Sequence, residues 1–201
     1  MRLAILLSGR GSNFVAIHDA IAGGVLAADI VAVISNRPEA PGIERARELG
    51  LPAHVLDHRA YPNRVAHEED VLRLLAEAEP DFIVLAGYMR LLSPTFVAAW
   101  PHRILNIHPS LLPSFPGVDA QAQAVAYGVK VSGCTVHFVD ENLDAGPIIV
   151  QRAIPVLDDD TPERLAARIL EQEHEAYVDA LCRLASSQWR VEGRRVLFSL
   201  G

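Results

Sequence analysis

An amide and an imidazole stand two residues apart in the segment Asn106-Ile107-His108-Pro109. They close an apolar stretch that we expect to be a strand, and strand alternation places both side chains on one face. Open parallel sheets bind ligands at the carboxyl ends of their strands. An amide donor beside an imidazole suits acyl transfer, because the amide can stabilise an oxyanion and the imidazole can move protons. The alternative, an Asn and a His that only end a strand, stays open on these residues alone.

A glycine-rich segment, Ser8-Gly9-Arg10-Gly11-Ser12-Asn13, separates the first expected strand from the first expected helix. Glycines let the backbone approach an anion closely, and a helix N-terminus offers N–H groups and a positive dipole end. Phe14 stands where a dinucleotide fingerprint requires its third glycine. The pattern therefore favours a phosphate monoester over a dinucleotide, with a purely structural tight turn as the alternative.

An acidic connection, Asp140–Pro147, lies between two expected strands of the second half. Such a run is most often a solvated turn. An Asp in this connection could instead orient His108 and favour its charged form, as the carboxylate of a catalytic triad does. Composition does not choose between these interpretations.

Composition excludes several other classes of protein. The chain has 201 residues, 50% of them hydrophobic and 21% charged, which is typical of one globular domain. Its 18 basic and 25 acidic residues give a net charge of -7, so we expect no nucleic-acid partner. Two distant cysteines argue against disulfides and a thiolate metal site, and they fit a cytoplasmic protein. His67 and His174 lack the second His of a zinc-protease helix, so we expect no metal. No apolar run approaches the length of a membrane span, so we expect no membrane partner.

Strands and helices are expected to alternate through the first half of the chain. The expected strands are Leu3–Leu7, Asp29–Ile34, Ala53–Leu56, Asp81–Ala86 and Arg103–Ile107, and the expected helices are Asn13–Ala22, Pro41–Leu49 and Arg64–Ala78. The last helix is predicted to bury Val65, Val71, Leu72 and Leu75 on one face. Alternating elements with unbroken apolar strands indicate a doubly wound, mostly parallel sheet.

The second half has a different pattern. Two strands, Gly133–Val139 and Pro147–Val156, are expected to pair antiparallel. Thr161 and Pro162 open a long helix that ends near Ala185, and a terminal hairpin follows. We therefore expect an α/β fold in one domain over residues 1–201. Its single doubly wound sheet would be mostly parallel, with antiparallel strands in the C-terminal half.

From Leu3 to the terminal hairpin, the chain resembles the phosphoribosylglycinamide formyltransferases, which depend on folate. The glycine-rich segment, the Asn106–Pro113 element and the acidic connection carry this resemblance, together with Leu85–Ser93 and Gln172-Glu173-His174. It implies transfer of a formyl group from the co-substrate 10-formyltetrahydrofolate to the amine of glycinamide ribonucleotide in purine synthesis. It also implies small-molecule substrates and a monomer or homodimer.

The resemblance also assigns roles to residues. Its catalytic set is Asn106, His108 and Asp144. The N-terminal part would hold the substrate phosphate at Gly11, Ser12 and Asn13, and Glu173 would contact the glycinamide ribonucleotide. The residues implied for folate binding are Arg64, Met89, Arg90, Leu92, Asn106, Asp140, Glu141 and Asp144.

Three positions depart from the family pattern. Asp119 and Gln121 stand near positions where the family commonly has His, and Leu170 replaces a polar residue of some relatives. Two other functions stay open, namely formyltetrahydrofolate hydrolysis and a non-catalytic folate- or nucleotide-binding module. Hydrolases of this kind carry an extra N-terminal domain, whereas this chain starts at its first strand, which favours transfer. A binding module would have no need of Asn106, His108 and Asp144 together.

Overall fold

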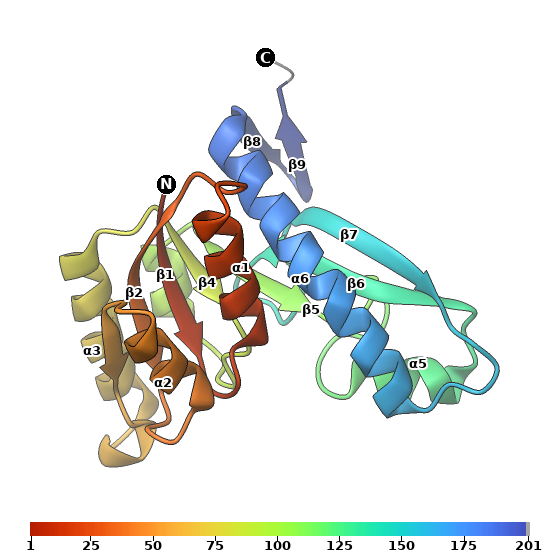
Figure 1. The fold of residues 1–201 in the computed structure, drawn as a ribbon, viewed down its shortest axis with the longest axis horizontal. Coiled ribbons are helices and arrows are strands. Elements are labelled where there is room, and N and C mark those ends of the chain that lie inside the picture. Colours follow the sequence, from red (N-terminus) through yellow and green to blue (C-terminus); the bar gives the residue numbers. More distant parts are fainter. Residues whose placement is uncertain (200–201) are drawn as a thin grey trace. The chain divides into compact units, whose positions relative to one another are not determined.

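The computed structural model describes residues 1–199 and falls into two compact units, Met1–Leu105 and the chain from Asn106 onward (Figure 1). Each unit is described by itself below. The single domain predicted over residues 1–201 therefore stays a prediction.

The first unit is a parallel sheet with helices on both faces. Its strands are β1 (Arg2–Leu7), β2 (Asp29–Ser35), β3 (Ala53–Val55) and β4 (Phe82–Leu85), followed by the start of β5 (Ile104–His108). They lie in the order β3-β2-β1-β4-β5, and β1 pairs parallel with both β2 and β4. Its helices are α1 (Ser12–Ala22), α2 (Pro41–Glu48), α3 (Arg64–Ala78) and α4 (Pro94–Ala99), with a 3-10 turn at His58–Ala60.

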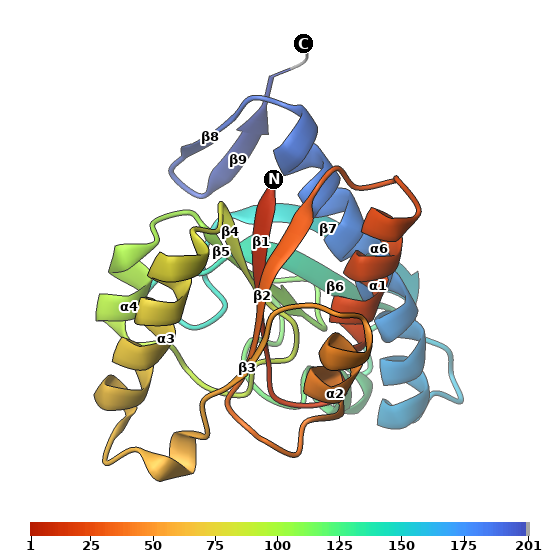
Figure 2. The same ribbon diagram turned by 60° about the vertical axis from the view of Figure 1, so that its left-hand side comes forward.

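The doubly wound arrangement is visible in Figure 2, where α1 and α2 lie on one side of β1 and β2, and α3 and α4 lie on the other. Because β1 is covered on both faces, all its residues from Leu3 to Leu7 are fully buried. The strands and helices predicted in this half are confirmed. The sequence analysis did not predict α4 or the 3-10 turn.

The buried face of α3 differs from the prediction. Val65 is 58% exposed and Leu72 is half-buried, whereas His67 and Glu68 are buried. The reason is that polar partners lie over this part of the helix. Glu68 accepts a hydrogen bond from the backbone N–H of Ser93 at 2.9 Å, and His67 Nε2 lies 2.9 Å from the carbonyl oxygen of Leu56. Only Val71 and Leu75 of the predicted apolar face are buried.

The second unit contains the antiparallel part of the sheet. Its strands follow the order β5-β6-β7-β9-β8, with β6 at Val131–Phe138, β7 at Ile148–Pro155, β8 at Trp189–Glu192 and β9 at Arg195–Phe198. The pairs β6–β7 and β8–β9 are antiparallel, as predicted, and β9 runs parallel to β7. The mixed, mostly parallel α/β class is therefore confirmed.

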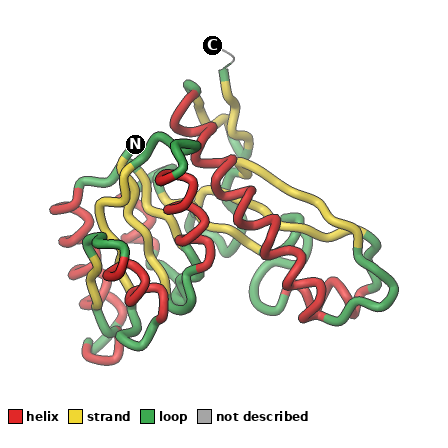
Figure 3. The backbone as a smooth tube through the Cα atoms, viewed as in Figure 1, coloured by secondary structure: helices red, strands yellow, loops and turns green. Residues whose placement is uncertain are grey.

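Two helices cover the second unit. The long α6 (Pro162–Ser186) packs on β6 and β7 (Figure 3). Thr161 caps this helix, because its side chain accepts a hydrogen bond from the backbone N–H of Arg164. The short α5 (Ala120–Tyr127) was not predicted. Within residues 1–199, every helix is too short or too polar to cross a membrane.

Candidate active site

His108 is the last residue of β5, and both of its ring nitrogens face acceptors. Its Nδ1 lies 3.4 Å from Asp144 Oδ2, and its Nε2 lies 2.8 Å from the carbonyl oxygen of Phe115. A neutral ring has only one N–H, so it would leave one acceptor facing a lone pair. The doubly protonated ring satisfies both contacts. The geometry therefore suits a charged imidazole.

Asp144 is held in place by more than this histidine. Its Oδ2 also accepts a hydrogen bond from the backbone N–H of Gly117 at 2.8 Å, and its side chain is only 9% exposed. Its backbone has a φ of 49°, which turns the chain sharply within the connection. Asp144 is thus not a solvated turn residue. Its neighbours differ, since Glu141 is exposed and Asp140 accepts from the backbone N–H of Asn142 at 2.9 Å.

The sequence analysis missed His137, which lies between Asn106 and Asp144. Its Nδ1 lies 2.8 Å from the carbonyl oxygen of Phe138, so the proton belongs on Nδ1. Its Nε2 then presents a lone pair to Asn106 Nδ2 at 3.4 Å and lies 3.8 Å from Asp144 Oδ1. Burial lowers the pKa of His137 and outweighs the Phe138 carbonyl and Asp144, which raise it. Burial therefore favours the neutral form of the ring.

A neutral His137 fixes the orientation of the Asn106 amide. Since Nε2 can only accept, the NH₂ group of Asn106 must face it rather than the amide oxygen. One amide hydrogen is used in this contact, and the second remains for a substrate oxygen. A histidine within an expected strand, three residues before the acidic connection, was the available signal in the sequence.

The segment after His108 is fixed by a threonine on β6. Thr135 Oγ1 donates to the carbonyl oxygen of Ser110 at 2.7 Å and accepts from the backbone N–H of Leu112 at 3.0 Å. Gln151 Nε2 donates to the same Oγ1 at 3.0 Å. This buried junction joins β6, β7 and the chain that leaves β5. It limits how far His108 and its neighbours can shift.

Glu173 lies on α6 and is only 8% exposed, whereas Glu171 and Glu175 on the same helix are exposed. Glu173 therefore lies on the buried side of α6. It lies near Cys134 on β6. Burial, with a further contribution from Glu173, raises the pKa of Cys134 to about 12, so this cysteine is a neutral thiol rather than a nucleophile.

In the first unit, Gly11 has a φ of 69° and precedes α1, whose first residues are Ser12 and Asn13. A Cβ at Gly11 would lie 3.2 Å from Leu7 Cδ2, so both the backbone angle and the packing require glycine. The turn on which the phosphate prediction rests therefore has the expected strand–turn–helix form. Asn13 is buried beneath it.

The four folate residues predicted in the first unit lie on two segments. Met89, Arg90 and Leu92 belong to the connection from β4 to α4, where Met89 is exposed and the other two are half-buried. Arg64 begins α3, with its Nε 3.9 Å from Glu68 Oε1. Because Glu68 also accepts from the Ser93 backbone, the start of α3 lies beside the end of that connection.

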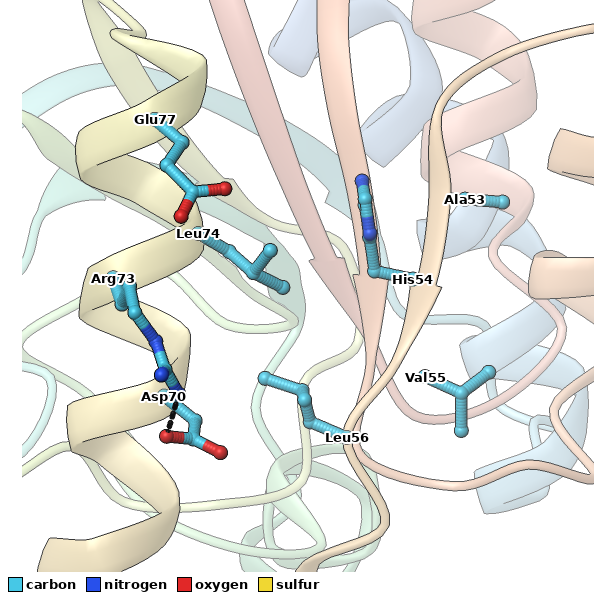
Figure 4. Close-up of a pocket in the computed structure, with 8 residues that line it drawn as sticks. All are labelled: Ala53, His54, Val55, Leu56, Asp70, Arg73, Leu74 and Glu77. Carbon is cyan, nitrogen blue, oxygen red and sulfur yellow. Dashed lines mark hydrogen bonds and ion pairs between the residues drawn. The ribbon is translucent and has the colours of Figure 1, made fainter.

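A separate groove of about 480 Å³ lies between α3 and β3 (Figure 4). The side chains of Leu56 and Leu74 point into it, and Asp70 pairs with Arg73 at its rim. None of the predicted site residues lines it. Within residues 1–199, no group of three or more His, Cys, Asp or Glu is placed to hold a metal ion.

The family model for formyl transferase matches residues 1–181. The chain belongs to the formyl transferase family. This formyl transferase is 50% identical, over 192 residues, to the trifunctional purine biosynthetic protein adenosine-3 of Drosophila pseudoobscura pseudoobscura. The match covers 94% of the chain but only 14% of that relative.

Two further relatives cover most of their own lengths. The phosphoribosylglycinamide formyltransferase of Escherichia coli (strain K12) is 42% identical over 177 residues, which cover 88% of this chain and 84% of that protein. Glycinamide ribonucleotide transformylase 1 from Symbiobacterium toebii superposes with a TM-score of 0.95 at 48% identity, covering 98% of this chain and 93% of that one. The family resemblance inferred from the sequence is confirmed.

One solved structure with a different activity has the same fold. A formyltetrahydrofolate deformylase from Pseudomonas syringae pv. tomato superposes on this formyl transferase with a TM-score of 0.90 at 28% identity. The match covers 98% of this chain and 65% of that chain. The fold therefore does not by itself separate formyl transfer from formyl removal.

Proposed function

We propose that this formyl transferase moves the formyl group of 10-formyltetrahydrofolate to the amine of glycinamide ribonucleotide. The products are N-formylglycinamide ribonucleotide and tetrahydrofolate. The observation that carries this proposal is the contact of Asp144 with His108, with the Asn106 amide oriented beside them by His137. The relatives from Escherichia coli and Symbiobacterium toebii carry the same activity in their names.

The proposed chemistry uses these residues as follows. The substrate amine attacks the formyl carbon, and the formyl oxygen becomes an oxyanion. The free amide hydrogen of Asn106 and the charged His108 stabilise that oxyanion. As the intermediate collapses, the bond from carbon to N10 of the folate breaks. The amine loses one proton and N10 gains one, so the reaction balances without a further reactant.

Asp144 makes this chemistry effective by orienting His108 and by placing a negative charge beside its ring. In the free protein the Phe115 carbonyl holds Nε2 of His108. A substrate oxygen that binds through this nitrogen must therefore replace that carbonyl. The backbone from Gly11 to Asn13 would bind the substrate phosphate, and Glu173 would bind the glycinamide ribonucleotide. Phosphate binding would convert binding energy into orientation of the amine.

The remaining assignments complete this proposal. The residues proposed to contact folate are Arg64, Met89, Arg90, Leu92, Asn106, Asp140, Glu141 and Asp144. We also propose that the protein acts in the cytoplasm on small molecules alone, as a monomer or homodimer. Sedimentation equilibrium would distinguish these two states.

The alternative function is hydrolysis of 10-formyltetrahydrofolate, which the deformylase likeness keeps in view. The test is the absorbance of tetrahydrofolate formed with and without glycinamide ribonucleotide, with the formylated product identified by mass spectrometry. We expect turnover only when the ribonucleotide is present, and a strongly reduced but measurable rate in His108→Ala. Equal folate release in both conditions would establish hydrolysis, and no release in either would establish a binding module.

A further inference from the structure

A buried serine in the first unit connects two segments to which the proposed function assigns different ligands. Ser8 begins the glycine-rich turn, and its side chain accepts a hydrogen bond from the backbone N–H of Met89 at 2.8 Å. Its own backbone N–H donates to the carbonyl oxygen of Gly87 at 3.1 Å. Ser8 therefore holds the connection from β4 to α4 at two points, just where that connection begins.

The hydroxyl of Ser8 has no freedom left in this arrangement. Because its oxygen accepts from Met89, its single proton is directed to Asn36 Oδ1 at 2.5 Å. Ser8 is 4% exposed and Asn36 is 2% exposed, so water does not compete for these bonds. The result is one directed chain of hydrogen bonds, from Met89 through Ser8 to Asn36.

The turn that carries Ser8 is itself fixed from the side of α2. The backbone N–H of Gly42 donates to the carbonyl oxygen of Gly9 at 3.0 Å. A Cβ at Gly42 would lie 2.9 Å from Leu7 Cδ2 and 3.0 Å from that carbonyl oxygen, so the two segments pack as closely as glycine allows. A shift of the turn would therefore be passed to Met89 through Ser8.

We propose that Ser8 and Asn36 are positioning residues that set the Met89–Leu92 segment relative to the phosphate-binding turn. Neither side chain touches the reacting atoms. They act by fixing the backbone that carries the folate side of the site. This inference rests on the proposed function, because that function assigns folate to Met89–Leu92 and phosphate to Gly11–Asn13.

A purely structural role would give a different result, and the chain offers a matched control. Ser35, at the end of β2, is also fully buried, and its hydroxyl also makes two hydrogen bonds. It donates to the carbonyl oxygen of Arg37 at 2.7 Å and accepts from the backbone N–H of Arg37 at 3.1 Å. Ser35→Ala removes a comparable buried hydroxyl whose two hydrogen bonds go to Arg37 rather than to Ser8, Gly87 or Met89.

The experiment compares Ser8→Ala, Asn36→Ala and Ser35→Ala in the full chain. Thermal melts give the Tm of each variant, so that variants with a similar loss of stability can be compared. Calorimetry measures the Kd of tetrahydrofolate, and steady-state assays measure KM for 10-formyltetrahydrofolate. We expect Ser8→Ala and Asn36→Ala to raise both constants about tenfold, the effect of losing roughly one hydrogen bond. The kcat at saturating substrate should change by less than about threefold. Ser35→Ala should leave both constants within about twofold of wild type.

Several results would overturn the inference. One is an unchanged Kd in Ser8→Ala, and another is an equal rise in Ser35→Ala. If Ser8→Ala does not fold, Asn36→Ala carries the same test, and Ser8→Thr, which keeps the hydroxyl, should restore binding. A wild-type protein that binds tetrahydrofolate but does not formylate glycinamide ribonucleotide would refute the proposed function alone. A wild-type protein that does not bind tetrahydrofolate would refute both.

Discussion

Replacing Asp144 by asparagine tests whether its charge, rather than its shape, serves the reaction. The amide oxygen of the new side chain can take the place of Oδ2, accept from the Gly117 backbone N–H and stay in contact with His108 Nδ1. The new NH₂ group would then replace Oδ1 and face the lone pair of His137 Nε2, 3.8 Å away. No buried group loses its partner. The fold should therefore persist, with a small change in Tm.

The expected loss of rate follows from the distance between the charges. His108 Nδ1 and Asp144 Oδ2 are 3.4 Å apart and both side chains are buried. At an effective dielectric constant of about 20, two unit charges at this distance attract each other by about 5 kcal/mol. The loss of rate therefore has an upper limit of between about 10³- and 10⁴-fold. Because the neutral amide still places an oxygen beside His108 Nδ1, we expect kcat to fall less than this bound, by about 10²–10³-fold.

The assay is kcat for Asp144→Asn, His108→Ala and the double variant. Once His108 is Ala, removing the carboxylate should cost little more. Asp160→Asn is the control, since Asp160 is a buried carboxylate of the same unit that holds the Leu157 backbone outside the site. Additive losses, or full activity in Asp144→Asn, would refute this reasoning.

Four other predictions follow from the geometry. Asn106→Ala should lower kcat by about 10²–10³-fold with little change in KM, as for loss of one oxyanion donor, and a loss confined to KM would contradict that role. His137→Ala should lower kcat by about tenfold, because Asn106 loses roughly one hydrogen bond. Unchanged steady-state kinetics would show that His137 does not serve the reaction. Gly11→Ala should lower the free energy of unfolding in urea by about 1–3 kcal/mol, because φ at this residue is 69°. The same variant should lose the stabilisation against unfolding that added phosphate gives. If phosphate still stabilises the variant, the phosphate binds elsewhere. Because burial lowers the pKa of His137 below its ordinary 6.5 in the folded protein, the unfolded chain takes up that proton at a higher pH. The contribution of His137 to the free energy of unfolding should therefore be complete above about pH 6.5 and fall below it. Urea titrations at pH 7.5 and 5.5 check this, and His137→Gln should show a smaller fall between the two pH values.

Local pattern predicted most of the fold because the elements of this chain are strongly marked. The apolar run Leu3–Leu7 could only be a buried strand, and Thr161 with Pro162 marked the start of α6. The short helices α4 and α5 were not predicted, because neither is much longer than two turns. Segments of that length show little periodicity of apolar residues. The face of α3 was mispredicted because pattern rules treat His67 and Glu68 as solvated. Their partners, Leu56 and Ser93, come from other segments.

The sequence by itself determined the order of the elements. It also placed Asn106 and His108 at the end of a strand, and Asp144 in a connection between two strands. Only the tertiary structure decided that Asp144 reaches His108, because this contact depends on how a connection between β6 and β7 turns back to the end of β5. The same holds for His137, whose neutral form and contact with Asn106 arise from burial between strands. Spacing along a chain records local geometry, whereas burial and the distance between charges are set by segments that meet only after folding.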